Sequence, residues 1–399
     1  MNCKITNKKI KPFMSFGLMP IANGFLKKDN FKKEFLFNME VGFSNEISLF
    51  QLNDHPKPKL MFNKDYPFFT SSSRYMIKHF KNYSNWVKKY YFKNTKKVIE
   101  IGSNDGTLLK NFKSPETEIL GIEPSKNVAS VAMSKKINTI NKFFSFKTAN
   151  SLKKFRNKTD LICGANAICH IPNLNDLIKG IDILLSKKGV FVFEEPYLGS
   201  MYEKTSYDQI YDEHIFMFSV SSVKKIFDLY NFDLIDVQKQ KTHGGSMRYV
   251  VARRGEYNIK NPVKKYILQE KKLNIDNLKG CLKFKQNCEN SKKKLRSMIL
   301  SIKKRNKSIA GYAATSKSTT ILNYCGINNK HINFICDTTK NKIGKYTPKT
   351  HIPIVDVNYF RKNIPDYTFL FAWNHKEEIF TKEKNFKENG GIWFSHVTL

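Results

Sequence analysis

The hydrophobic residues between positions 97 and 200 recur with the two spacings that mark alternating strands and helices. Short apolar runs rich in β-branched residues predict four strands, at Val98–Ile101, Ile119–Ile122, Leu161–Cys163 and Val190–Phe193. Helical spacing between these runs predicts helices over 106–113, 126–135 and 174–185. Strands that alternate with helices in this way are typical of a doubly wound, Rossmann-like α/β domain.

The flanking segments predict two further parts of the chain. Residues 1–70 carry short apolar segments broken by proline and glycine, and they predict a small irregular domain with hairpins. The central domain is expected over 71–256, with a helix at 72–94, a loop-rich stretch after Pro196, and a closing strand pair at Phe232–Val237 and Met247–Ala252. Residues 257–399 predict two amphipathic helices at 260–306 and then a second α/β unit, with strands at 309–314, 332–336 and 367–372 and a helix at 317–324.

Length and composition agree with a multidomain protein. The 399 residues are too many for one typical domain, and no apolar run reaches the roughly eighteen residues of a membrane-spanning helix. The first residues lack the apolar stretch of a signal peptide, so we expect a cytoplasmic protein without a membrane partner. Seven cysteines, an odd number without a close C-x-x-C pair, fit a reducing compartment.

The net charge of +35 raises the possibility of a nucleic-acid partner. Lysine supplies nearly all of the charge and is spread along the whole chain, whereas arginine, the usual choice for bidentate recognition of phosphates and bases, is scarce. We therefore expect a solvated basic surface without specific nucleic-acid binding. Such a surface would also attract anionic substrates such as nucleotide sugars.

A glycine turn follows the first central strand and marks a candidate ligand site. Gly102 and Gly106 stand four residues apart, Glu100 lies inside the strand, and Glu123 ends the next strand. A dinucleotide fingerprint has the different spacing G-x-G-x-x-G. The pattern resembles the E-x-G-x-x-x-G loop of Rossmann-like methyltransferases, which implies that the ligand is S-adenosylmethionine. The alternative is an ordinary strand, turn and helix with incidental glycines.

Several motifs together resemble one family, the three-domain sugar C-methyltransferases. The motifs are Asn104-Asp-Gly-Thr107, Gly121-Ile-Glu-Pro124, Asp208-Gln-Ile-Tyr-Asp-Glu-His214, His243-Gly-Gly-Ser-Met-Arg248, Gly311-Tyr-Ala-Ala-Thr-Ser-Lys317 and Ala372-Trp-Asn374. The resemblance runs almost end to end. It implies an N-terminal zinc-binding domain, a central methyltransferase domain and a C-terminal α/β domain. It also implies an acceptor that is a nucleotide-linked 4-keto-6-deoxy sugar, methylated on the carbon next to the ketone.

Methylation of carbon needs a base to remove the α-proton, a donor for the developing oxyanion, and a dry pocket. His214 is the candidate base because imidazole titrates near working pH. Tyr211 is expected to donate to the oxyanion, and Glu213 to orient a partner or bind a sugar hydroxyl. The resemblance implies that these three residues form the active site, although Asp212 stands where the family usually has histidine. The alternative for His214 alone is a surface or capping histidine.

Other candidate residues come from the same resemblance. His170 is expected beside donor and acceptor, or as a helix-start histidine, and Tyr66 in an aromatic segment over the site. Glu100, Gly102, Asn104, Gly106, Glu123 and Asn166 are the expected donor-binding residues. His243 and Arg248 flank a double-glycine turn and are expected to contact the sugar, unless the glycines serve only the turn. Lys317 and Asn374 are expected to bind the nucleotide, unless the C-terminal unit is mainly scaffold.

The N-terminal part departs from the family at its zinc site. The family has two C-x-x-C pairs, which supply four thiolates to a structural zinc. Here Cys3 remains, but the other three positions are Thr6, Ser44 and Ile47. We predict that zinc is absent, that no residue ligates a metal, and that apolar packing replaces the zinc site.

Two other activities remain open on the sequence alone. O- or N-methylation of a related sugar or small molecule would need no α-proton removal. A nucleic-acid methyltransferase would account for the charge and would bind RNA or DNA with strong salt dependence.

Overall fold

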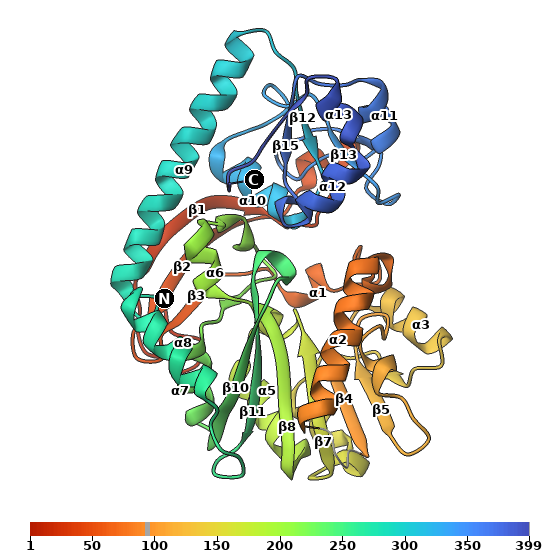
Figure 1. Cartoon of the computed structure of the whole chain (residues 1–399), viewed down its shortest axis with the longest axis vertical. Coiled ribbons are helices and arrows are strands. Elements are labelled where there is room, and N and C mark those ends of the chain that lie inside the picture. Colours follow the sequence, from red (N-terminus) through yellow and green to blue (C-terminus); the bar gives the residue numbers. More distant parts are fainter. Residues whose placement is uncertain (92–95, 399) are drawn as a thin grey trace.

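The computed structural model describes residues 1–91 and 96–398. The central part of the chain forms a seven-stranded sheet, which lies in the lower half of Figure 1. The strand order is β10-β11-β8-β7-β4-β5-β6, with β4 to β8 parallel and β11 antiparallel to both of its neighbours. The strands are β4 Lys97–Ile101, β5 Glu118–Ile122, β6 Thr139–Ile140, β7 Thr159–Ala165, β8 Leu185–Pro196, β10 Phe232–Gln240 and β11 Ser246–Arg253. This confirms the predicted Rossmann-like sheet and its closing strand pair.

Helices cover both faces of this sheet. Successive side chains of a strand point to opposite sides, so each strand packs residues against helices on both faces. Val98 packs with helix α2 (Arg74–Tyr91) on one face, whereas its neighbour Ile99 packs with α5 (Leu174–Leu184) and α7 (Val220–Asp228) on the other. The remaining helices of this region are α3 Lys126–Ser134, α4 Phe146–Ser151 and α6 Leu198–Lys204. Among the described residues, no helix is long and apolar enough to cross a membrane.

The N-terminal part forms an antiparallel sheet of four strands in the order β1-β2-β3-β9. Three strands come from the N-terminal residues, β1 Pro12–Pro20, β2 Leu36–Ser44 and β3 Leu49–Leu52, and a short helix α1 spans Pro58–Met61. The fourth strand, β9 (Phe216–Met217), comes from the central part of the chain. The stretch after Pro196 therefore joins the two sheets directly.

The C-terminal part is a second α/β unit with a five-stranded parallel sheet in the order β14-β13-β12-β15-β16. Its strands are β12 Ile309–Tyr312, β13 Ile335–Asp337, β14 Ile354–Asp356, β15 Tyr367–Leu370 and β16 Ile392–Phe394. Its helices are α10 Ser316–Cys325, α11 Val357–Lys362, α12 Lys376–Lys382 and α13 Lys384–Glu388. The boundaries at 70 and 256 stay predictions.

Two helices connect the central part to this unit, as the sequence predicts. They are α8 (Asn261–Lys272) and α9 (Leu278–Lys304), and α9 runs along one side of the molecule from the central part to the C-terminal unit (Figure 1). Residues of β1, β2, α9 and α10 share one apolar core, which includes Phe13, Phe284 and Ile321. The N-terminal sheet thus packs against the C-terminal unit.

The expected helix over 106–113 is wrong. The structure has turns there and only one 3-10 turn, η3. Gly106 has a φ of +76°, which an α-helix does not allow, and the Asn111 side chain donates to the carbonyls of Thr107 and Leu108 beside the few backbone hydrogen bonds of the turn. The 3-10 turns of the chain are η1 Lys28–Lys33, η2 Thr70–Ser72, η3 Leu109–Phe112, η4 Lys153–Phe155, η5 Ile168–His170, η6 Tyr207–Gln209, η7 Thr242–Gly244 and η8 Trp373–His375.

Candidate active site

The candidate donor site lies at the carboxyl ends of the parallel strands, where ligands bind in open α/β sheets. Gly102 follows β4 with a φ of +68°, and a Cβ added to it would overlap the Cβ of Ala167. Gly106 has a φ of +76°, and its Cβ would overlap Ile137. The loop therefore needs glycine at both positions, for its backbone conformation and for the close approach of neighbouring side chains.

Glu123, which follows β5, fixes this loop. Its Oε2 accepts the backbone N–H of Asn104 at 2.9 Å, and its Oε1 accepts the backbone N–H of Ser125 at 2.7 Å. Burial raises the pKa of the Glu123 carboxyl above its usual value, and the two backbone hydrogen bonds act against that rise. Each carboxylate oxygen keeps a further acceptor position for a ligand hydroxyl.

A cavity of about 380 Å³ opens beside the loop and contains most of the predicted donor-binding side chains. The predicted residues that line it are Tyr66, Glu100, Gly102, Asn104, Glu123, Asn166, His170 and His243. Three buried polar atoms of these residues have no hydrogen-bond partner: Glu100 Oε2, Asn166 Oδ1 and His170 Nε2. Burial raises the pKa of Glu100 well above its usual range. An apolar cavity with a few such polar atoms fits S-adenosylmethionine.

An aromatic segment, residues 66–71, contributes to the lining of this cavity and is held there by hydrogen bonds. Asn104 Oδ1 accepts the backbone N–H of Thr70 at 2.9 Å, and Asp105 Oδ2 accepts the backbone N–H of Ser71 at 3.0 Å. Asn127 donates its side-chain amide to the carbonyl of Tyr66 at 2.8 Å. The donor loop therefore holds the end of the segment through Asn104 and Asp105, and α3 holds Tyr66 through Asn127.

His214 and Tyr211 form a hydrogen-bonded pair. The Nδ1 of His214 lies 2.8 Å from the carbonyl oxygen of Gln209, which can only accept, so Nδ1 carries the proton of the neutral ring. Nε2 therefore accepts the hydroxyl of Tyr211, at 2.6 Å. Burial, together with His170 nearby, lowers the pKa of His214 well below its usual value. The imidazole is thus neutral at neutral pH, with its basic nitrogen bound to Tyr211.

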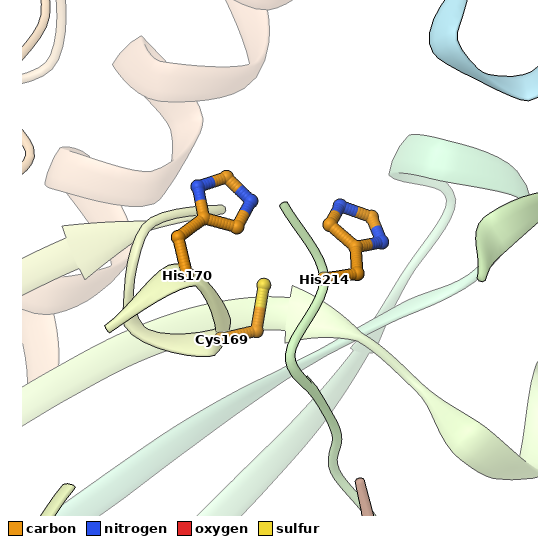
Figure 2. Close-up of side chains that lie close together, drawn as sticks. All are labelled: Cys169, His170 and His214. Atoms are coloured by element: carbon orange, nitrogen blue, oxygen red, sulfur yellow. The ribbon is translucent and has the colours of Figure 1, made fainter. Parts of the chain in front are cut away.

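His170 lies beside this pair at η5, just past β7. Its ring stacks on that of His214, with centroids 5.3 Å apart, and on its other side it lies near Phe62 at 5.5 Å. Figure 2 shows the two imidazoles and the Cys169 sulfur gathered in one place. Burial lowers the pKa of His170 to about 3, so this ring is also neutral.

Glu213 connects the cluster to the N-terminal part of the chain. Its Oε1 accepts the side-chain amide of Asn23 at 2.6 Å, and its Oε2 accepts the hydroxyl of Tyr66 at 3.3 Å. Burial raises the pKa of Glu213 to about 6. Asp212 accepts the backbone N–H of Ala22 at 3.0 Å, so the loop at residues 22 and 23 is attached to this carboxylate pair.

Arg248 lies apart from this cluster, in the interior. It is 2% exposed, and its Nε and Nη2 donate to Oε2 of Glu194 at 3.2 and 2.9 Å. Its guanidinium also lies over the rings of Tyr83 and Trp86, 4.1 and 5.1 Å from their centroids. These contacts engage the guanidinium group of Arg248, which the sequence analysis expects to contact the sugar.

His243 is placed at the cavity by the same network. Glu194 also accepts the hydroxyl of Thr242, at 2.8 Å, which fixes the η7 turn. His243 has a φ of +53°, and Gln209 donates its side-chain amide to the carbonyl of this residue. Of the two residues predicted to flank the turn, His243 lines the cavity. Arg248 binds Glu194, the residue that also binds Thr242 of the turn.

The C-terminal unit reaches this region through Lys317 and Asn374. Lys317 Nζ donates to Oδ1 of Asn374 at 3.2 Å and lies 4.9 Å from the ring centroid of Trp373. Trp373 in turn donates its indole N–H to Asp208 at 2.7 Å. Asp208 belongs to the same motif as His214, so one segment of the central part carries both the histidine and the contact with the C-terminal unit.

A second cavity, of about 820 Å³, adjoins Glu213. Glu213 and Asn23 line it together with five lysines: Lys27, Lys64, Lys340, Lys342 and Lys345. Tyr66 lines the first cavity and Glu213 the second, so the Tyr66–Glu213 hydrogen bond links a residue of one cavity to a residue of the other.

Sequence reasoning missed two groups of residues here. Glu194 and Glu195 are adjacent carboxylates at the end of a strand, on the edge where ligands bind, and that position is a signal the sequence contains. Asn23 carries no comparable signal, because its hydrogen bond to Glu213 joins residues 190 positions apart.

The four positions of the family zinc site do not fit a zinc ion in this chain. The four positions are Cys3, Thr6, Ser44 and Ile47, which offer a single thiol. Cys3 and Ile47 are buried in one apolar core together with Ile5 and Leu49. We expect wild-type protein and its Cys3→Ser variant to have the same zinc content by elemental analysis. One equivalent of zinc per chain that disappears in the variant would contradict this.

Replacing Gly102 by alanine is expected to weaken S-adenosylmethionine binding at least about tenfold in calorimetric titrations. The added methyl would overlap Ala167 and would require a backbone conformation that costs an alanine of order 1 kcal/mol or more. Gly255→Ala is the matched control, since Gly255 has a similar φ of +78° with no atom within 4 Å of the added Cβ. Equal donor affinity in the two variants would disprove a role for the close approach at Gly102.

The fold and this cavity define an S-adenosylmethionine-dependent methyltransferase. Comparison with known families agrees: residues 73–237 match a methyltransferase domain, and residues 241–397 match the C-methyltransferase C-terminal domain. The chain therefore belongs to the S-adenosylmethionine-dependent methyltransferases and carries the additional C-terminal domain of C-methyltransferases. This confirms the resemblance identified in the sequence.

Individual relatives are also similar to the chain. The C-methyltransferase NovU of Streptomyces niveus is 29% identical over 381 residues, which cover 95% of this chain and 90% of NovU. Among solved structures, the PH0226 protein of Pyrococcus horikoshii OT3 is 16% identical, covers 47% of this chain and 95% of its own, and has a TM-score of 0.37. The plantazolicin methyltransferase BpumL in complex with SAH is 12% identical, covers 44% and 82%, and has a TM-score of 0.35.

Proposed function

We propose that this methyltransferase transfers a methyl group to carbon, at the position next to the ketone of a nucleotide-linked 4-keto-6-deoxy sugar. The observation that carries the proposal is the buried His214–Tyr211 pair, in which the His214 ring stacks on His170 of the donor cavity, next in sequence to Glu213, which lines the lysine-lined cavity. O- or N-methylation would need no removal of a proton from carbon, and this difference separates the two reactions in the test below.

His214 is the base in this proposal. Its Nε2 lone pair is basic because Nδ1–H is committed to the Gln209 carbonyl, and the lowered pKa keeps the ring unprotonated at working pH. An acceptor carbonyl that takes over the Tyr211 hydroxyl as its hydrogen-bond donor frees Nε2 to remove the α-proton. Burial and Glu213 raise the pKa of Tyr211 well above its usual value, so Tyr211 stays protonated and can donate to the enolate oxygen.

The methyl group is then transferred within the same enclosed space. S-adenosylmethionine supplies an electrophilic methyl on a sulfonium sulfur, and Glu100, Asn104, Glu123 and Asn166 are positioned to bind it. The enolate carbon forms the new bond to methyl while the carbonyl re-forms, and the sulfur keeps the electron pair of the broken bond. The removed proton remains on His214, and the aromatic segment at 66–71 excludes water from the site.

The lysine-lined cavity supports an anionic acceptor. Five ammonium groups around one cavity attract a diphosphate. Lys317 and Asn374, which bind each other in the C-terminal unit, line neither cavity. Glu213 and Asn23, which also line this cavity, are placed to bind sugar hydroxyls.

The test is to incubate the protein with S-adenosylmethionine and a panel of nucleotide 4-keto-6-deoxy sugars, and to follow the acceptor by mass spectrometry. A gain of one CH₂ on a carbon supports the proposal, and methylation only on oxygen or nitrogen overturns it. In deuterium oxide without the methyl donor, the α-carbon of the acceptor is expected to take up deuterium. An O- or N-methyltransferase would not catalyse that exchange.

A further inference from the structure

Two loops of the central part bring a cysteine and two histidines to one point. Cys169 and His170 belong to η5, and His214 lies in the loop before β9. The Sγ of Cys169 and one ring nitrogen of each histidine all lie within 4.8 Å of one another. Figure 2 shows the three side chains converging from the two loops. Within the described residues, this is the one group of three or more His, Cys, Asp or Glu side chains with such a spacing.

The cluster is buried and incompletely hydrogen-bonded. Cys169 is 1% exposed, and His170 is 8% exposed with its Nε2 left without a partner. A buried imidazole nitrogen without a hydrogen bond is costly, and a ligand that accepts its lone pair would recover that cost. Because His170 also lines the donor cavity, an ion can reach the cluster through that opening.

Backbone contacts fix the ligand positions in advance. Glu195 Oε1 accepts the N–H groups of Ala167 and Ile168 at 3.0 and 2.7 Å, which holds η5 against the end of β8. The Gln209 carbonyl fixes the ring of His214 through Nδ1 and directs Nε2 inward. Such outer contacts, which orient the ligand side chains, are typical of metal sites.

One thiolate and two imidazoles select a borderline or soft ion, and zinc is the commonest ion bound by this set. Tetrahedral zinc has bonds of about 2.0 to 2.3 Å, which places ligand atoms roughly 3.5 Å apart. The cluster needs to contract by about 1 Å to reach this distance. On binding, the Cys169 thiol would give up its proton to solvent.

We propose that Cys169, His170 and His214 form a reversible zinc-binding site, and that zinc bound there inhibits methyl transfer. Zinc would take the lone pair of His214 that the base needs and would displace the Tyr211 hydroxyl from Nε2. The inhibitory part rests on the proposed function, whereas binding of the ion does not.

Binding is tested first, with Co²⁺ as a spectroscopic substitute for Zn²⁺ and without any acceptor. Wild-type protein is expected to develop the near-ultraviolet charge-transfer band of a thiolate–Co²⁺ bond, and Zn²⁺ should remove it by displacement. The band should be absent from the Cys169→Ser and Cys169→Ala variants. It should persist in Cys336→Ser, in which a cysteine equally buried in β13 is replaced. Absence of the band from wild-type protein, or its persistence without Cys169, overturns the proposal.

Inhibition is tested with the acceptor that the panel identifies. Zn²⁺ is expected to inhibit wild-type turnover, with full recovery on addition of a chelator. Loss of a ligand should raise the half-inhibitory Zn²⁺ concentration at least about tenfold in Cys169→Ser, relative to Cys336→Ser. Equal inhibition of the two variants overturns the inhibitory role. Because the Co²⁺ titration needs no acceptor, failure of every acceptor in the panel counts against the proposed function and leaves the metal site separately tested.

Discussion

Replacement of His214 by asparagine is expected to lower kcat for carbon methylation about 10²- to 10⁴-fold, the usual contribution of a general base. The asparagine amide can still donate to the Gln209 carbonyl, as Nδ1 does in the wild type, so the loop should keep its conformation. The variant lacks any group equivalent to Nε2 and cannot accept the α-proton. Affinity for S-adenosylmethionine, measured calorimetrically, should be unchanged, and deuterium exchange at the acceptor carbon should disappear with turnover.

His331→Asn is the matched control for this substitution. His331 lies in the C-terminal part, where its Nδ1 contacts the side chain of Asn328, and it has no contact with the site. This variant should keep wild-type kcat and exchange. A His214→Asn protein that exchanges the α-proton at the wild-type rate would show that another residue is the base.

Replacement of Arg248 by methionine is expected to destabilise the protein by about 3 to 5 kcal/mol, because it leaves the buried Glu194 carboxylate without its main counter-charge. Burial acts to raise the pKa of Glu194, but the hydrogen bond from His79 and the charge of Arg248 hold it at about 2. Without Arg248, the unpaired charge must be hydrated or neutralised. The free energy of unfolding is measured by chemical denaturation monitored by circular dichroism, at a pH where Glu194 is ionised in the wild type.

Arg254→Met provides the comparison, since Arg254 follows the same strand but is half exposed and pairs with Asp228 and Asp233 at the surface. Its loss should cost less than about 1 kcal/mol. If Arg248→Met instead kept full stability and only raised KM for the acceptor, Arg248 would be a substrate ligand, as the sequence alone suggests.

Most of the central fold could be predicted because its signals are local. Val98 and Ile99 are both apolar because the sheet is covered on both faces, and that double burial is what a continuous β-branched run indicates. The glycine loop and Glu123 could also be located from local signals. Each lies at the end of one apolar run, so a single short segment of sequence is enough to recognise it.

The parts that could not be predicted depend on contacts between distant segments. Strand β9 has only two residues and exists because Phe50 and Gln51 pair with Met217 and Phe216. No periodicity can indicate so short a strand. The role of Arg248 likewise depends on Glu194, a residue 54 positions earlier, and spacing along the chain does not reveal that pair.

The contacts of the loop at residues 22 and 23 affect when the enzyme becomes active during its synthesis on the ribosome. Asn23 donates to Glu213, and the carbonyl of Ala22 accepts the hydroxyl of Thr319. The ribosome adds Glu213 and Thr319 to the chain long after it has added this loop. A growing polypeptide that has passed the methyl-donor domain already contains Gly102, Asp212 and His214, yet it lacks Thr319, the second residue that binds Ala22, and the cavity lysines at 340, 342 and 345. A ribosome-bound chain cut short before Thr319 is therefore expected to bind the methyl donor without methylating an acceptor, so activity would arise only after Thr319 and the lysines beyond it have been translated.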